Sequence, residues 1–291
     1  MASFAVRKFR DRLAYALGIT CLIIAMVPLA SILIEVVANG ITAINTSFIT
    51  SISTPSFGNE PAGGVGPAIQ GTLIILGLSC LIGIPPGIFA GIYLAEFGDN
   101  KFGSTVRFFN DVFTQFPSIV IGILISALIV IPTRAFSPVA GGVALALIML
   151  PIITRTTEES LKLVPNSIRD AASALGIRRW RSTISIILNT GKTGVATGII
   201  LAIARVSGET APLILTVLGS NFFYTGCPAS QSCPIDALPL RIFDDAFKLG
   251  GPAAVHQAWG AALVLIGIVL ALNISIRFAI RGRYNQARTR T

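Results

Sequence analysis

The chain has 291 residues, of which 53% are hydrophobic and only 12% are charged. Soluble domains carry about 25% charged residues, so this composition excludes an ordinary soluble protein and indicates an integral membrane protein. The net charge of +9 would suit a polyanion such as a nucleic acid, but the positions of the basic residues argue against a nucleic-acid partner.

Six segments are apolar enough to cross a membrane as helices, which takes about 20 predominantly apolar residues. They are rich in Leu, Ile, Gly and Ala and lack the ten-residue alternation of a membrane barrel. The sequence therefore predicts an all-α integral membrane protein with a single transmembrane domain over residues 1–291. The predicted spans cover residues 13–37, 67–95, 110–132, 136–154, 191–218 and 252–278.

The first two spans each carry a feature that needs interpretation. Basic residues precede the first span, as in a secretory signal, but the apolar run continues to Glu35 and is too long for one. We therefore expect a retained membrane anchor. In the second span, Pro85 and Pro86 remove two backbone donors, so we expect the helix to kink or break there.

The basic residues predict the side on which each loop lies. With the N-terminus in the cytoplasm, six spans place four segments on the cytoplasmic side: the two termini, residues 96–107 and the segment from Arg155 to Lys192. These segments hold 18 of the 22 lysines and arginines, as the positive-inside rule requires. Both termini are therefore predicted to be cytoplasmic, and the excess of basic residues needs no polyanion.

The outer loop between the fifth and sixth spans contains Cys227 and Cys233. Two cysteines six residues apart in an oxidising compartment can close a small loop, and we predict a disulfide between them. The sequence near them offers no further metal ligands, so no metal site is predicted.

The cytoplasmic loop over residues 155–190 is long enough to dock a partner. Asn166 is expected to begin a short helix of small residues, which Gly176 ends, and a second helix leads into the fifth span. Such a helix can enter a cleft of a soluble partner, although an ordinary amphipathic connector remains an alternative. The run Gly191–Thr193, "GKT", resembles the end of a Walker A loop, but Ile186 stands where that loop needs glycine, so this chain is not expected to bind nucleotide.

Arg205 and Glu209 interrupt the otherwise apolar fifth span. They are one helical turn apart and share a face with Gly194 and Gly198, so we expect this face to meet other helices or a cavity rather than lipid. A lone arginine there costs about 2.5–3.5 kcal/mol on insertion scales. Either the pair only neutralises itself and holds the bundle together, or the guanidinium serves an anion pathway, because its planar donors match two oxygens at once.

The cytoplasmic loop resembles the EAA loop of ABC-importer permeases, whose pattern is E-A-A-x3-G-x9-I-x-L-P. Aspartate replaces the family's glutamate, and Asn189 replaces its final proline. In that family the loop is a coupling helix that docks into an ATPase subunit, and the resemblance implies that partner here. ATP and Mg²⁺ would then bind the partner, and no cofactor is expected in this chain. The matching residues are Asp170, Ala171, Ala172, Gly176, Ile186 and Leu188.

Residues 204–213, "ARVSGETAPL", resemble the R-x-x-G-E-T-A-P segment of phosphate-specific ABC-transporter permeases. Residues 116–123, "FPSIVIGI", and 150–165, "LPIITRTTEESLKLVP", resemble the same family, particularly its PstA branch. Together with the EAA loop, these stretches cover most of residues 110–215. The resemblance implies a type I ABC importer permease fold in the cytoplasmic membrane of a bacterium or an archaeon.

The resemblance also implies an assembly and a route for the substrate. The chain would pair with a second permease subunit (PstC-like), two copies of an ATPase subunit (PstB-like) and an extracytoplasmic phosphate-binding protein (PstS-like). Arg205 and Glu209 are then expected to line or gate the phosphate path between the permeases. Arg155, at the inner end of the fourth span, is a second candidate for the anion route. No catalytic residue is expected in this chain.

Three other functions fit the sequence less well. A stand-alone secondary carrier or anion channel would use Arg205 and Glu209 as a proton-linked relay, but it would not need a coupling helix. An intramembrane enzyme finds no Ser/His, His/Glu or paired-Asp constellation within the spans. An importer of another oxyanion, such as sulfate or molybdate, is disfavoured by the "GETAP" stretch alone. The predicted function is therefore the permease subunit of an ATP-driven phosphate importer.

Overall fold

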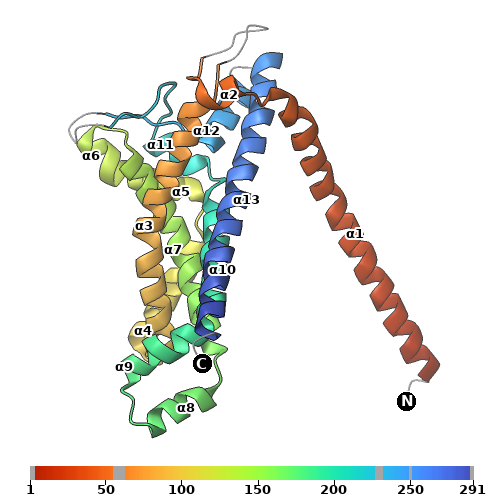
Figure 1. Cartoon of the computed structure of the whole chain (residues 1–291), viewed down its shortest axis with the longest axis vertical. Helices are drawn as coiled ribbons and strands as arrows, with labels where there is room; N and C mark the ends of the chain where they lie inside the picture. The colour runs from red at the N-terminus through yellow and green to blue at the C-terminus, as the bar shows by residue number, and fades with distance from the viewer. Residues whose placement is uncertain (1–3, 55–62, 227–231, 249–250, 289–291) are drawn as a thin grey trace.

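The computed structural model describes residues 4–54, 63–226, 232–248 and 251–288, and this part of the chain is almost entirely helical. Among the described residues, the one β contact is an isolated bridge between Leu218 and Ile235. Long helices form the body of the molecule (Figure 1). They are α1 (Phe4–Ala43), α3 (Gly66–Glu96), α7 (Pro138–Lys162), α10 (Leu188–Val206) and α13 (Pro252–Arg288).

Shorter helices lie at the two ends of these long ones (Figure 1). One end carries α2 (Thr46–Thr50), α11 (Ala211–Thr216) and α12 (Leu238–Phe243), and the other carries α8 (Asn166–Ala174) and α9 (Arg179–Ser182). The start of α1 and the end of α13 lie at the α8 end. This agrees with the predicted placement of both termini on the side of the 155–190 loop.

The remaining helices connect α3 to α7. They are α4 (Lys101–Gln115), α5 (Ser118–Ile125) and α6 (Ile131–Thr133), with a π-helical turn over Ser126–Val130. A second π-helical turn, Thr183–Ile187, joins α9 to α10, and a third, Asp244–Lys248, follows α12.

The described residues contain five helices that are long and apolar enough to cross a membrane. The pair α4 and α5 makes a sixth if it is counted as one broken span. The predicted all-α membrane architecture is thereby confirmed, and the described residues offer five or six spans against the six expected from the sequence.

The structure differs from the predicted continuous span over 110–132. Helix α4 ends at Gln115, α5 begins at Ser118, and the two are bent by 104°. Phe116 is extended, with φ −66° and ψ 132°, because Pro117 disfavours the helical conformation of the residue before it and lacks an N–H group. By contrast, α3 continues without a break through Pro85 and Pro86, so of the expected kink or break the break does not occur.

Close packing of α3 against α7 accounts for the continuity of α3. A Cβ atom on Gly87 would lie 2.9 Å from the side chain of Ile153, and one on Gly91 would lie 2.5 Å from that of Thr157. Small residues let membrane helices approach and gain van der Waals contact. Ile153 and Met149 of α7 are fully buried in the main apolar cluster, so α7 is the centre of the bundle.

Helix α1 diverges from the rest of the bundle (Figure 1). None of its most apolar window is buried within this chain, whereas 61% of the corresponding window of α7 is buried. Its contact with the bundle includes Gly40, which lies against Trp259 and Leu263 of α13. Most apolar side chains of α1 therefore face outward, as the helix's predicted place in lipid allows.

Candidate functional site

The break between α4 and α5 lies beside a small cavity. The cavity has a volume of about 130 Å³ and is lined by residues of α4, α5, α7 and α10 and by Phe116 of the break. Its polar lining residues are Thr114, Ser118 and Arg205, and the others are apolar or aromatic. The cavity therefore has one arginine and two hydroxyl-bearing residues in an otherwise apolar wall, and a guanidinium suits a small oxyanion.

Arg205 lies in the last turn of α10, because the helix ends at Val206. The predicted unbroken span over 191–218 is thus divided into α10 and the short helix α11, with a non-helical linker at 207–210. Gly208 lowers helix propensity there, and Pro212 starts a new helix well because its ring fixes φ. The expected helical face is therefore interrupted between Arg205 and Glu209.

Arg205 and Glu209 still form an ion pair, but a loose one. The Nη2 atom of Arg205 lies 3.5 Å from Oε1 of Glu209. The arginine side chain is 61% exposed in this chain, whereas that of Glu209 is 15% exposed. Much of the guanidinium is therefore left open, which is the state required of a group that meets a passing anion.

Arg155, the second candidate, lies on the same face of α7 as part of the cavity wall. Pro151 and Ile152 line the cavity, and they precede Arg155 by one helical turn. Its Nε atom lies 2.6 Å from Oε1 of Glu159, and both side chains are exposed. Arg155 thus lies one turn from the cavity toward the α8 end of the bundle.

The predicted coupling loop has the expected helix–glycine–helix form. Gly176 follows α8 with φ +71°, a left-handed conformation that glycine adopts without strain and other residues rarely do. Asp170 and Ala171 are exposed on α8, whereas Ala172 is buried against the chain's own body. Pro165, rather than Asn166, takes the N-cap position and makes no side-chain capping bond.

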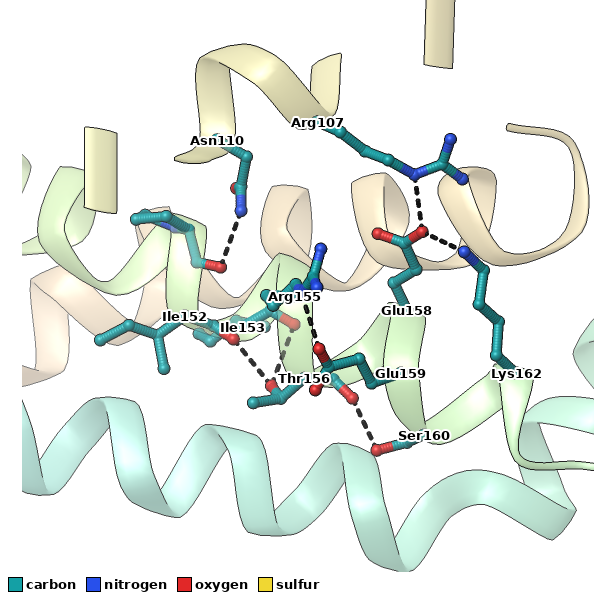
Figure 2. A network of polar contacts seen from close by, with 11 residues as sticks. Arg107, Asn110, Ile152, Ile153, Arg155, Thr156, Glu158, Glu159, Ser160 and Lys162 are labelled. Atoms are coloured by element: carbon teal, nitrogen blue, oxygen red, sulfur yellow. Dashed lines mark hydrogen bonds and ion pairs between the residues drawn. The ribbon is translucent and has the colours of Figure 1, made fainter. Parts of the chain in front are cut away.

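Sequence reasoning missed a buried charge cluster near the α8 end. Figure 2 shows Arg107 of α4 and Lys162 of α7 both directed at Glu158. The Oε1 atom of Glu158 accepts from Arg107 Nε at 2.7 Å and from Lys162 Nζ at 2.6 Å, and the glutamate side chain is only 3% exposed. The signal for this cluster was a pair of glutamates, 158 and 159, inside a helix that packs closely against its neighbours.

The Arg107–Glu158 contact attaches α4 to α7, the helix at the centre of the bundle. Arg107 also donates to the backbone oxygens of Leu94, at 2.8 Å, and Gly98, at 3.0 Å, at the end of α3. One turn further, the side-chain amide of Asn110 donates to the Pro151 carbonyl at 3.3 Å (Figure 2). These contacts fix α4 along α7 up to the cavity.

A second set of buried charges lies at the opposite end of the bundle. Burial raises the pKa of Asp236 to about 7, although its carboxylate accepts a hydrogen bond from the Ala237 backbone N–H at 2.9 Å. Burial likewise raises the pKa of Asp245 to about 6, against the opposing effect of Arg241, whose Nε donates to Asp245 Oδ2 at 3.0 Å. Arg241 also donates from Nη1 to the side-chain oxygen of Asn221 at 3.1 Å, so it connects α12 to the segment after α11.

The predicted disulfide stays a prediction. Cys227 lies outside the described residues. Cys233 is buried, and its backbone N–H donates to the Phe136 carbonyl at 2.8 Å. Cys21 and Cys80 are free.

Comparison with known proteins places the chain in a family. Residues 87–283 match the family model described as "Binding-protein-dependent transport system inner membrane component". The chain is 40% identical over 276 residues to a phosphate transport system permease protein PstA of Yersinia pestis, covering 94% of this chain and 90% of that protein. It is 35% identical over 278 residues to a probable PstA of Methanocaldococcus jannaschii, covering 95% of each.

Solved structures share the fold at low sequence identity. A bacterial alginate ABC transporter chain, crystallised with a periplasmic protein bound to an alginate pentasaccharide, aligns with a TM-score of 0.64 and 14% identity over 94% of this chain and 95% of that one. The inward-facing methionine transporter MetNI aligns with a TM-score of 0.57 and 16% identity over 75% of this chain and 94% of that one. The predicted type I ABC importer permease fold is confirmed.

The full-length agreement in sequence and the shared fold lead to one assignment. This chain belongs to the PstA family of phosphate transport system permease proteins, a branch of the binding-protein-dependent transport system inner membrane components, and it is a multi-pass membrane transport subunit rather than an enzyme.

Proposed function

We propose that this chain is the permease subunit of an ATP-driven importer of inorganic phosphate and forms half of the translocation path. The observation that carries this proposal is the identity of 35–40% to curated PstA proteins over nearly the whole chain. The cavity beside Arg205 gives the proposal a place in the structure. Sulfate or molybdate importers and stand-alone carriers have no observation in their favour.

The proposed anion route begins at Arg205 and passes the helix break. Arg205 binds two phosphate oxygens when it releases Glu209, to which it is held at 3.5 Å. Thr114 and Ser118 line the same cavity. Broken helices at membrane depth are a recurrent way to place polar groups around a transported ion. Arg155, one turn further along α7, would receive the anion next.

The proposed coupling surface is the exposed side of α8. Asp170 and Ala171 are exposed on this short helix, and the large apolar side chain of Leu175 is exposed directly after it. An acidic, a small and an apolar side chain together suit a cleft in an ATPase subunit. Ala172 and Gly176 have other roles. Ala172 packs α8 against the rest of the chain, and Gly176 turns the chain after α8. ATP and Mg²⁺ would bind the ATPase subunits, with this chain contributing movement and no catalysis.

The proposed assembly contains a second, PstC-like permease, two PstB-like ATPase subunits and an extracytoplasmic PstS-like phosphate-binding protein. It lies in the cytoplasmic membrane of a bacterium or archaeon, with both termini and α8 on the cytoplasmic side. The positive-inside distribution of lysine and arginine supports this orientation. So does the location of both chain ends at the α8 end of the bundle (Figure 1).

The test is phosphate uptake into proteoliposomes that contain the complete importer. Arg205→Ala removes the open guanidinium, and uptake should fall roughly 10- to 100-fold, the equivalent of about 1.5–3 kcal/mol for a hydrogen bond to a charged group. Arg205→Lys keeps the charge but loses the planar fork, so its uptake should be intermediate.

The matched control is Thr197→Ala, an exposed position on the same helix whose hydroxyl bonds only within α10. Its uptake should equal that of the wild type. Wild-type uptake by the Arg205→Ala importer, with the partner subunits still co-purifying, would refute a role of Arg205 in the phosphate path.

A further inference from the structure

The coupling helix α8 is connected to the transmembrane bundle through one buried carboxylate. Glu96 is the last residue of α3, and its side chain is 3% exposed. Its Oε1 atom accepts two hydrogen bonds from Arg169 of α8, from Nε at 3.1 Å and from Nη2 at 2.8 Å. A carboxylate removed from water in this way loses its hydration, and hydrogen bonds from a guanidinium replace it.

Arg169 also holds the end of α7. Its Nη2 donates to the Leu161 carbonyl at 2.8 Å, and its Nη1 donates to the Val164 carbonyl. These oxygens belong to the last turn of α7 and the residues after it, where helix carbonyls lack intrahelical partners. A single guanidinium on α8 therefore contacts the cytoplasmic ends of two transmembrane helices, α3 and α7.

A second arginine of the same loop contacts the same end of α3. Arg179 of α9 donates from Nη2 to the Glu96 backbone oxygen, and its guanidinium lies 4.8 Å from the centre of the Phe97 ring. Positive charge at a helix C-terminus is favoured by the helix dipole. Both helices of the coupling loop are thus attached to residues 96–97.

Apolar contacts beneath these polar ones make the attachment stiff. Leu161, Val164 and Ile187 are buried in one cluster, against which Ile168 of α8 packs. Packed side chains transmit displacement because protein interiors are dense and have little room to yield.

Building on the proposed function, we propose that Glu96 and Arg169 are positioning residues that transmit movement of α8 to α3 and α7 and so link ATP hydrolysis to opening of the phosphate path. Neither residue touches phosphate or ATP. Their effect is on the coupling between the two, which is a free energy separate from the binding of the ATPase to α8.

The experiment uses the complete importer in proteoliposomes and measures phosphate uptake and ATP hydrolysis in one preparation. For Glu96→Ala and Arg169→Ala, the ATPase should still co-purify and basal hydrolysis should persist, but phosphate transported per ATP should fall about tenfold. The double variant should be no worse than the worse single one, because both remove the same link. Arg169→Lys retains a single donor toward Glu96 and should fall between.

Asp99→Asn is the matched control, since Asp99 is exposed three residues beyond Glu96. It should keep the wild-type ratio of phosphate to ATP. A wild-type ratio in Glu96→Ala would overturn the proposal. So would a loss of ATPase co-purification in proportion to the loss of uptake, since that result means that the residues only shape the docking surface.

Failure of the proposed function would look different. A wild-type importer that hydrolyses ATP but takes up no phosphate would refute the substrate, not the link. In that case the link is measured by the stimulation of ATP hydrolysis on adding the binding protein, which Glu96→Ala and Arg169→Ala should lower about tenfold while Asp99→Asn leaves it unchanged.

Discussion

Two arginine–glutamate contacts in this chain differ in how tightly they are held. Arg107 and Glu158 come from different helices, meet at 2.7 Å, and bury the carboxylate, with Lys162 as a second partner. Arg205 and Glu209 are neighbours in sequence, lie 3.5 Å apart and leave the arginine largely exposed. The first contact has the features of a permanent fastening, whereas the second has those of a pair that opens.

The difference follows from what surrounds each pair. The Glu158 carboxylate is buried where α7 packs against its neighbours, so water cannot replace a lost partner. Arg205 lies at the end of α10, beside a cavity and a non-helical linker. An arginine–glutamate pair therefore stabilises the fold where it is buried and serves the proposed function where it is exposed. The following experiments test this difference.

Exchanging the charges of the loose pair should give the largest effect. Arg205→Glu and the double variant Arg205→Glu/Glu209→Arg should both lose phosphate uptake, by roughly 10- to 100-fold, because position 209 lies in the linker after α10 and does not line the cavity. If the pair served only to neutralise itself, the double variant would restore the attraction. Recovery of uptake in the double variant, measured in proteoliposomes, would therefore assign the pair to the fold.

Removing the carboxylate of the tight contact should affect stability rather than transport chemistry. Glu158→Ala leaves Arg107 and Lys162 without their shared acceptor, and we expect a loss of roughly 3 kcal/mol in the free energy of unfolding. The measurement is detergent-solubilised thermal unfolding. Glu159→Ala is the control, because Glu159 is 58% exposed and exposed pairs contribute about 1 kcal/mol or less. Equal losses at the two positions would contradict the contrast.

Adding a methyl group between α10 and α7 tests whether the body of α10 packs tightly against α7, in contrast to its end at Arg205. A Cβ atom on Gly198 would lie 1.9 Å from Oγ1 of Thr156, so Gly198→Ala should cost about 1–3 kcal/mol of unfolding free energy through overpacking. Gly77→Ala is the control, because no atom lies within 4 Å of a Cβ there. An unchanged unfolding temperature for Gly198→Ala would mean that the two helices separate easily.

The buried ion pairs could not be predicted from the sequence, whereas the helices could. Glu158 and Arg107 are 51 residues apart, and Glu96 and Arg169 are 73 apart. Their meeting depends on how α3, α4 and α7 pack, which no local pattern encodes. By contrast, the all-α membrane architecture and the turn at Gly176 depend on local composition and φ preference, and the structure agrees with both.

The prolines show that local sequence rules alone do not decide where a helix ends. Pro117 ends α4 and bends the chain by 104°, but Pro85 and Pro86 lie inside a continuous α3. The residue type is the same, and the difference lies in the packing, because α3 is pressed along α7 through Gly87 and Gly91. Arg205 and Glu209 were identified from sequence, but the helix end between them and the cavity beside them depend on the same tertiary arrangement.

The last effect concerns a buried acid at the other end of the bundle, Asp236. Its pKa is raised by burial to about 7 from 3.8, so the folded chain keeps a proton that the unfolded chain releases between those values. Stability is therefore highest at low pH within this window and falls as pH rises toward 7, by at most about 1.4 kcal/mol per pH unit.

Asp236→Asn removes this charge while its side-chain oxygen can still accept from the Ala237 N–H. Its unfolding temperature in detergent should depend less on pH between 5 and 8 than that of the wild type, and should exceed it at pH 8. Asp99→Asn, at an exposed position, should keep the wild-type profile. If Asp236→Asn unfolds at a lower temperature than the wild type at pH 8, the carboxylate is a charged partner like Glu158 rather than an acid that burial keeps protonated.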